Sequence, residues 1–328
     1  MTVHFSRVAA RLFAMPILFC AATVSAQEKV TVRMDFIAWG THAAMHLANE
    51  RGWFKEVGLD VTVQDGTGSN NTIQLVGTGQ VDVGQVQLGV MPIARENGLQ
   101  VRSIAAWFRK ADLAVLVDRD SPAKTVKDLA GKTLVVFPGS PWTPYIDSYL
   151  RTGGQTRDTL KILNVAPAAM VSTYTAKQAD GVMTPAPFGM PLVESTRPSK
   201  ALLMADAGIA FPSYGLIASE STIEKRADML RKMIRVQARA WDYIYAGNVD
   251  EAVQAIIKQR PNANLNPVFL KGQIEGYKAF IHTANSLGKP TGVQNDADWV
   301  EAIRDMERTN VIKPGRKPGE FYTNSLIN

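Results

Sequence analysis

Hydrophobic and polar positions alternate in short runs along the first part of the chain, and each run precedes a segment with helical spacing. Residues 30–36 read VTVRMDF and alternate as a half-buried strand does. Thr41 is placed to cap a helix over residues 43–50, which Gly52 ends, and residues 59–63 form the next strand. This order of strand, helix and strand predicts a parallel sheet covered by helices.

The same pattern continues to about residue 204. Ser69 or Asn70 can cap a helix that ends near Gly77. Further strands are predicted at residues 81–83, 102–108, 114–118, 132–136, 161–164, 181–183 and 200–204. Ser140 is expected to begin another helix, with Pro141 as its first residue. From Tyr214 onward the spacing is mainly helical, so two α/β units and a helical tail are predicted.

The first 26 residues have the pattern of an export signal. Arg7 and Arg11 precede an apolar stretch, residues 12–24, that is shorter than the roughly 20 residues of a membrane helix. The sequence Val-Ser-Ala then fits a cleavage site, and we expect cleavage after Ala26 and a periplasmic location. An uncleaved anchor is the alternative. The only cysteine, Cys20, would leave with this segment.

Composition and charge narrow the function further. A chain of 328 residues is long enough for two domains. The formal net charge of +6 is spread along the sequence, so no nucleic-acid partner is expected. Without a cysteine, the processed chain has no disulfide and no thiol nucleophile. We expect no cofactor and no enzymatic activity, because no nucleophile–base pair or phosphate-binding loop stands out.

Three stretches resemble a known family. They are residues 34–61 (MDFIAWGTHAAMHLANERGWFKEVGLDV), 66–89 (GTGSNNTIQLVGTGQVDVGQVQLG) and 128–142 (DLAGKTLVVFPGSPW). Together they resemble ABC-type binding proteins for thiamine pyrimidine precursors, with their nitrate, sulfonate and taurine relatives. The resemblance implies an α/β fold of the type II periplasmic binding protein class, in which two Rossmann-like lobes are joined by two crossover segments.

The resemblance also implies how the chain is divided. After the signal peptide, residues 1–26, lobe one comprises residues 27–113 plus 214–328, and lobe two comprises residues 114–213. A small-molecule ligand would lie between the lobes, which would close on it by a hinge motion. The implied partner is an ABC transporter permease with its ATPase, and the binding protein itself is expected to be a monomer.

Candidate ligand-binding residues follow the predicted strands of lobe one. The loop after the first strand carries Asp35, Trp39, Thr41 and His42. In the resembled family an acidic residue, an aromatic or amide residue and a histidine recur in this loop, although Trp39 stands where asparagine is common. Further candidates are Ser69 and Asn70 at a helix start, the amide of Gln85, and Trp107, which ends a strand beside Phe108.

Lobe two supplies the opposite side of the predicted cleft. Its candidates are Ser140, Trp142, Thr143, Tyr145, Thr184 and Phe188. We expect Trp39 and Trp142 to be opposing walls for a flat ring, with Asp35 as the polar anchor. The candidates are rich in aromatic residues and poor in cations, which favours an aromatic or heteroaromatic, pyrimidine-like ligand over a sulfonate or nitrate anion.

Three alternatives to a transport protein are considered: a metal-binding protein, an enzyme and a ligand-binding partner of a membrane sensor. His42 and His46 are four residues apart and could share a metal, but no third ligand is evident, so no metal site is expected. The resembled fold is shared with the yeast-type pyrimidine synthase, which uses a cysteine-rich motif, and with porphobilinogen deaminase, which needs a cysteine. A ligand-binding partner of a membrane sensor would have the same sequence features as a transport protein.

Overall fold

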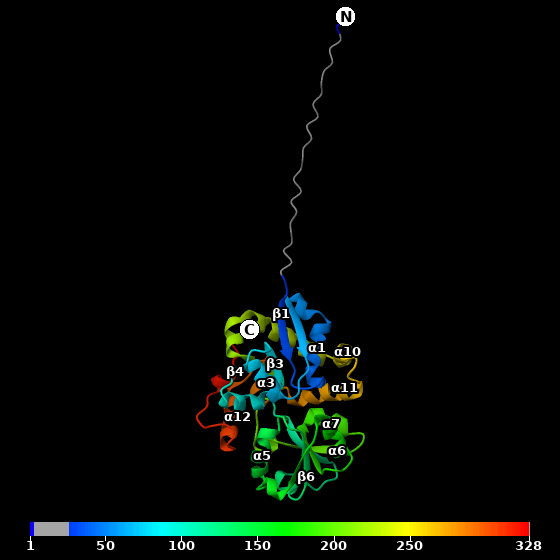
Figure 1. The fold of residues 1–328 in the computed structure, drawn as a ribbon, viewed down its shortest axis with the longest axis vertical. Coiled ribbons are helices and arrows are strands. Elements are labelled where there is room, and N and C mark those ends of the chain that lie inside the picture. The colour runs from blue at the N-terminus through cyan, green and yellow to red at the C-terminus, as the bar shows by residue number, and fades with distance from the viewer. Residues whose placement is uncertain (3–25, 328) are drawn as a thin grey trace.

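The chain forms two lobes, one above the other in Figure 1, and each is built around a five-stranded sheet. The computed structural model describes residues 1–2 and 26–327. The predicted signal peptide therefore lies almost entirely outside the described residues. Within the part that the structure describes, no helix is long and apolar enough to cross a membrane.

The sheet of lobe one has the strand order β2-β1-β3-β10-β4. β1, β2 and β3 are parallel, whereas β10 is antiparallel to both of its neighbours. The strands span Glu28–Arg33 (β1), Leu59–Gln64 (β2), Val83–Gln87 (β3), Val101–Ala106 (β4) and Tyr214–Ser219 (β10). Lobe one is thus assembled from two separate stretches of the chain.

The sheet of lobe two has the order β7-β6-β8-β5-β9, in which β5 is antiparallel to β8 and β9. Its strands span Leu113–Asp118 (β5), Thr133–Val136 (β6), Lys161–Asn164 (β7), Gly181–Pro185 (β8) and Ser199–Leu203 (β9). Both sheets are therefore mixed: the parallel pairs that the sequence predicts are present, and each sheet also contains antiparallel pairs. β5 and β10 are the strands that the chain enters as it crosses between lobes. Each begins on the side where the parallel strands end.

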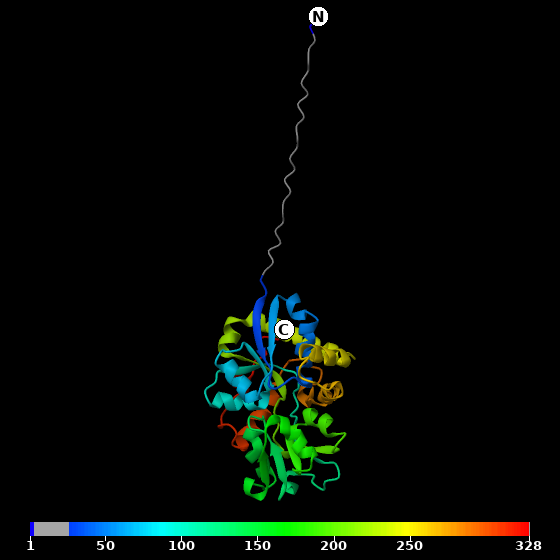
Figure 2. The same ribbon diagram turned by 45° about the vertical axis from the view of Figure 1, so that its right-hand side comes forward.

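Helices cover both sheets and continue beyond them (Figures 1 and 2). The helices of lobe one before the first crossover are Ala43–Glu50 (α1), Trp53–Glu56 (α2), Ser69–Gly77 (α3) and Met91–Glu96 (α4). Lobe two contains Ile146–Thr152 (α5), Met170–Thr175 (α6) and Ala186–Val193 (α7). After β10 come Glu220–Lys225 (α8), Ala227–Tyr245 (α9), Val249–Gln259 (α10), Pro267–Gly276 (α11), Asp296–Arg308 (α12) and Pro318–Phe321 (α13).

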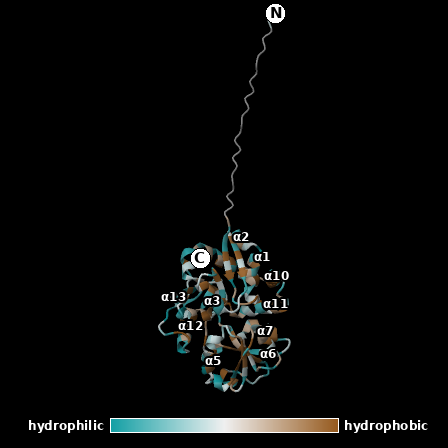
Figure 3. Cartoon of the chain, in the orientation of Figure 1, coloured by the Kyte–Doolittle hydropathy of each residue, from teal (hydrophilic) through white to brown (hydrophobic). Residues whose placement is uncertain are grey.

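Hydrophobic residues are concentrated on the central strands of each lobe (Figure 3). In α9 the residues with helical spacing, such as Leu230, Met233 and Trp241, are buried as the sequence predicts. α11 crosses the boundary between the lobes and packs on α7. There Gly272 faces Pro191 and Gly276 faces Pro187, and a Cβ on either glycine would lie within 3.4 Å of the proline. This contact joins the lobes on one side of the gap between them.

Several element boundaries differ from the sequence-based expectations. The first strand ends at Arg33 rather than residue 36, which frees Asp35 for the following loop. The strand predicted at residues 81–83 is β3, which begins at Val83, so Gln85 lies inside a strand. Tyr214 begins a strand, not a helical region. Thr41 and Ser69 do not cap the helices that follow them with their side chains.

Candidate functional site

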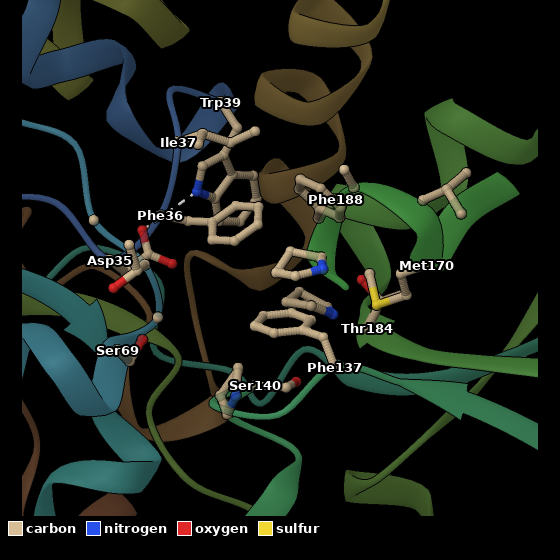
Figure 4. Close-up of a pocket in the computed structure, with 18 of the residues that line it drawn as sticks. Asp35, Phe36, Ile37, Trp39, Ser69, Phe137, Ser140, Met170, Thr184 and Phe188 are labelled. Carbon is tan, nitrogen blue, oxygen red and sulfur yellow. Dashed lines mark hydrogen bonds between the residues drawn. The ribbon is translucent and has the colours of Figure 1, made fainter. Parts of the chain in front are cut away.

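A cavity of about 490 Å³ lies between the lobes (Figure 4). Loops that follow β1 and β2 form its lobe-one side, together with the start of β10, and the ends of β6 and β8 with α6 and α7 form the side of lobe two. Clefts at the carboxyl ends of parallel strands are the usual ligand sites of open α/β sheets. The topology therefore brings these loops to one place.

Asp35 is the acidic side chain of the cavity wall and is only 4% exposed. Its Oδ1 accepts a hydrogen bond from Nε2 of His42 at 2.7 Å and one from Nε1 of Trp39 at 3.3 Å. Both donors come from the seven residues that follow Asp35, so this short segment orients its own carboxylate. Both bonds end on Oδ1, which leaves Oδ2 for the phenol of Tyr214 beside it or for a donor on a ligand.

The position of this loop is fixed by the neighbouring turn at Gly66 to Ser69. The backbone N–H of Gly68 donates to the carbonyl of Asp35 at 2.6 Å, and Thr72 Oγ1 donates to the carbonyl of Met34 at 2.8 Å. Gly68 has φ of 132°, and a Cβ there would lie 2.7 Å from the carbonyl oxygen of Gly139 in lobe two. Only glycine fits this approach, which brings the two lobes into contact at the rim of the cavity.

Aromatic rings from both lobes surround the carboxylate. Trp39 meets Phe188 edge to face, with ring centroids 5.1 Å apart, and meets Tyr214 in the same way at 5.4 Å. Phe36 of lobe one stacks on Phe137 of lobe two at 5.5 Å. A flat ring that enters the cavity would therefore have aromatic faces and edges available from both lobes.

Two hydroxyl groups extend the polar part of the site. Burial raises the pKa of the Tyr214 phenol well above its ordinary value, and the nearby charge of Asp35 raises that pKa further. The phenol therefore keeps its proton and remains a donor. Thr184, which is 1% exposed, lines the cavity, and its Oγ1 has no hydrogen-bond partner within the described protein. A buried, unpaired hydroxyl at a cavity wall is available to a ligand.

Six of the fourteen predicted site residues line the cavity. They are Asp35, Trp39, Ser69, Ser140, Thr184 and Phe188. Three others lie directly behind this wall and support it. His42 holds Asp35, and Gln85 donates from Nε2 to the backbone carbonyl of Thr41 at 2.8 Å. These three side chains are fully buried, so their place is behind the cavity wall.

Trp142 does not form the wall that the sequence suggested. Residues 140–143 make a turn, in which Thr143 N–H donates to the Ser140 carbonyl, and the helix α5 begins later, at Ile146. This turn directs Trp142 into the core of lobe two, where its Nε1 donates to the carbonyl of Thr184 at 3.4 Å and its ring packs on Tyr149. Phe137 occupies the position in the wall that was expected for Trp142.

Four more candidates also lie elsewhere. Asn70 and Thr143 are exposed and do not contribute to the wall. Tyr145 is buried, stacks on Phe211 at 4.9 Å and donates its hydroxyl to the carbonyl of Gly89. Trp107 packs under the backbone of Gly292, and its neighbour Phe108 is also in the core, so neither of these aromatics reaches the cavity.

Sequence reasoning missed most of the apolar lining. The missed residues include Phe36, Ile37, Phe137, Met170, Val171, Leu192, Tyr214 and Phe269. Phe36 and Phe137 lie in the loops that follow β1 and β6, as Asp35 and Ser140 do, so the same signal could have found them. Phe269 belongs to α11, and no local pattern indicates that this helix meets the cleft.

His42 and His46, in the turn before α1 and in α1 itself, are the pair that the sequence offered as metal ligands. Their rings are 6.5 Å apart, and among the described residues no group of three or more potential ligands could hold a metal ion. Burial lowers the pKa of His46 to about 3, so this ring is neutral at physiological pH. Its Nδ1 lies 2.9 Å from Oε1 of Gln259, a contact in which the nitrogen donates.

Comparison with known proteins identifies relatives of this chain. Residues 39–250 match the family model described as NMT1/THI5 like. The formylaminopyrimidine-binding protein of Halalkalibacterium halodurans is 25% identical over 292 residues, which are 86% of each chain. The 4-amino-5-hydroxymethyl-2-methylpyrimidine phosphate synthase THI11 of Saccharomyces cerevisiae is 24% identical over 312 residues, which cover 92% of this chain and 88% of that protein.

A solved structure shows the same architecture. The periplasmic aliphatic sulphonate binding protein SsuA from Escherichia coli has a TM-score of 0.66 at 15% identity, and the match covers 89% of this chain and 90% of that one. The two-lobed α/β fold that the sequence resemblance implied is therefore confirmed.

Proposed function

Because the chain belongs to the NMT1/THI5-like family, we propose that it is the periplasmic solute-binding component of an ABC importer. In this proposal the cavity captures a small molecule with a flat, aromatic or heteroaromatic ring. Residues 27–113 with 214–328 then close against residues 114–213 by a hinge motion, and the closed protein delivers the ligand to a permease with its ATPase. The name of the bacterial relative, which binds a formylaminopyrimidine, supports a pyrimidine-like ring.

The chemical composition of the cavity wall is the observation that carries this proposal. Aromatic rings of Trp39, Phe36, Phe137 and Phe188 surround a single carboxylate, Asp35. A ring nitrogen or an amine can donate to this carboxylate while the ring contacts the aromatic side chains. Pockets with a mostly apolar lining and a few polar groups are typical of small-molecule binding sites.

The same wall disfavours the anion alternative. Among the described residues that line the cavity there is no lysine, arginine or histidine, and His42 behind the wall already contacts Asp35. A sulfonate or nitrate that enters this site would be removed from water without a cationic side chain of the wall to pair with it, which costs free energy. The enzyme alternative requires catalysis without a thiol, because Cys20 is the only cysteine of the sequence.

Native purification from the periplasm, followed by mass spectrometry of the carried ligand, tests this function. We expect a ring compound, returned unchanged after incubation with the protein, and an N-terminus at Gln27.

Calorimetry should detect binding of 4-amino-5-hydroxymethyl-2-methylpyrimidine but not of nitrate or an alkanesulfonate. If only the anions bind, the proposed ligand class is wrong. If the protein converts the ligand into a new product, the proposed binding function is wrong and the protein is an enzyme. Genes for a permease and an ATPase beside the gene for this protein would support import, whereas a neighbouring membrane-sensor gene would support sensing.

A further inference from the structure

The cavity opens to solvent between apolar side chains of both lobes. On the side of lobe one, Ile37 is 57% exposed, and Phe269 lies beside Val268, which is 72% exposed. On the side of lobe two, Val171 and Leu192 are partly exposed where they line the cavity. Ile37, Phe269, Val171 and Leu192 come from four separate segments of the chain but line the same cavity, and we call these four partly exposed residues the apolar mouth.

This mouth differs from the rest of the described surface. Apart from Met1, the large hydrophobic side chains that are strongly exposed are Ile37, Val268, Leu287 and Val300. Of these, Ile37 lines the cavity, and Val268 is the chain neighbour of the lining residue Phe269. A contiguous exposed apolar patch on a soluble protein usually marks a binding surface. The patch is continuous with the cavity that holds Asp35, so the occupant most consistent with it is part of the same ligand.

Polar groups lie on both sides of the cavity, with aromatic rings between them. In Figure 4, Asp35 and Ser69 lie at one side of the cavity, and Met170 lies at the other, beside Thr184. A molecule whose donor meets Asp35 and whose ring contacts the aromatic side chains therefore extends toward Met170 and Thr184. The volume of about 490 Å³ is within the range of roughly 300–1,000 Å³ that holds drug-sized ligands rather than a bare ring.

We propose that the ligand is amphiphilic: a flat nitrogen-bearing ring whose donor contacts Asp35 carries an apolar chain that leaves through this mouth. The inference rests on the proposed function, because it assumes that the ring binds in the cavity. It adds that the chain contributes affinity, since lobe closure buries it between Val171 and Leu192 on one side and Ile37 and Phe269 on the other.

A homologous series of 4-amino-2-methylpyrimidines with 5-alkyl chains of one to eight carbons tests the inference. Burial of one methylene corresponds to about a fourfold gain in affinity, so calorimetry should show Kd falling about fourfold per carbon until the chain passes the mouth. Alkanesulfonates of the same lengths should not bind. If the short pyrimidine binds and longer chains give no gain, the inference is overturned while the proposed function stands.

Two variants test where the apolar chain of the ligand lies in the protein. Leu192→Ser should reduce the gain per carbon, whereas Val300→Ser, an exposed aliphatic residue of α12 outside the cavity, should leave the gain unchanged. Equal gains in Leu192→Ser and wild type would show that the chain does not pass this residue and would overturn the assignment. Failure of every pyrimidine to bind would contradict the inference and the proposed ring specificity together.

Discussion

The rings of Phe36 and Phe137, which belong to different lobes, stack with centroids 5.5 Å apart and planes inclined by 27°. Phe36 also meets Phe188 of lobe two at 6.2 Å. Both lobe-two rings line the same cavity, so the contact that joins the lobes and the contact that would hold a ligand share side chains. Under the proposed function, ring binding would therefore be coupled to lobe closure through these aromatic side chains.

Phe137→Leu should weaken binding of 4-amino-5-hydroxymethyl-2-methylpyrimidine by about three- to tenfold. Leucine keeps much of the apolar volume but removes the stacking, which contributes about 0.5–1.5 kcal/mol beyond area burial. Calorimetry measures the change, and circular dichroism checks the fold. An affinity equal to that of wild type would mean that Phe137 is only part of the core.

Asp35→Asn should reduce affinity for an amine-bearing ring by about 10- to 100-fold. A hydrogen bond to a charged group contributes about 1.5–3 kcal/mol, and asparagine retains the shape but not the charge. Asp158→Asn, an exposed carboxylate of lobe two, is the matched control and should bind like wild type. Equal affinities in both variants would show that Asp35 does not contribute to ligand binding.

Trp142→Phe should lower stability more than it lowers affinity. The variant loses the hydrogen bond from Nε1 to the Thr184 carbonyl, worth about 1 kcal/mol, and some packing on Tyr149. Urea unfolding should therefore shift to lower concentration, while Kd for the pyrimidine changes less than about threefold. A loss of affinity without a loss of stability would indicate that Trp142 contacts the ligand and would contradict its placement in the core of lobe two.

Acid should destabilise the protein partly through His46. Burial lowers its pKa from 6.5 to about 3 in the folded state, so between these values the unfolded state binds more protons. This contribution to stability is complete above pH 6.5 and is lost as the pH falls toward 3, by up to about 1.4 kcal/mol per pH unit.

His46→Gln removes this titration. Urea unfolding at several pH values between 4 and 7 should show a shallower dependence of stability on pH in the variant than in wild type. Arg260 and His42 are the charged or titratable groups that act on His46 beside its partner Gln259, and both remain in the variant. Identical slopes for the two proteins would contradict the assignment.

The sequence was most informative where the pattern was local. Residues 59–63, which lie in β2, and the buried face of α9 were predicted correctly, because alternation and helical spacing depend only on neighbouring residues. β3 was misplaced because its sequence, VGQVQ, contains polar residues although the strand is fully buried. The Nε2 atoms of Gln85 and Gln87 donate to Thr41 and Asp112, which are distant in sequence, and no local pattern reveals these bonds.

The site was predicted to a similar extent and for the same reason. Asp35 and Trp39 were found because they follow a strand that the alternation identifies. Trp142 was placed wrongly because the turn at Ser140 decides its direction, and a helix start at Ser140 would have directed it elsewhere. Phe269 depends on the packing of α11 over α7, which is a tertiary contact.

The central place of β10 in the sheet of lobe one has a consequence for biogenesis. β3 and β4 are held together through β10, which is synthesised after the whole of lobe two. Lobe two is one continuous stretch and can fold as soon as it is available, whereas lobe one must wait for pairings between residues more than a hundred positions apart. Until then β3 and β4 present unpaired edges, so the nascent chain is most exposed to aggregation and proteolysis in the half that arrives first.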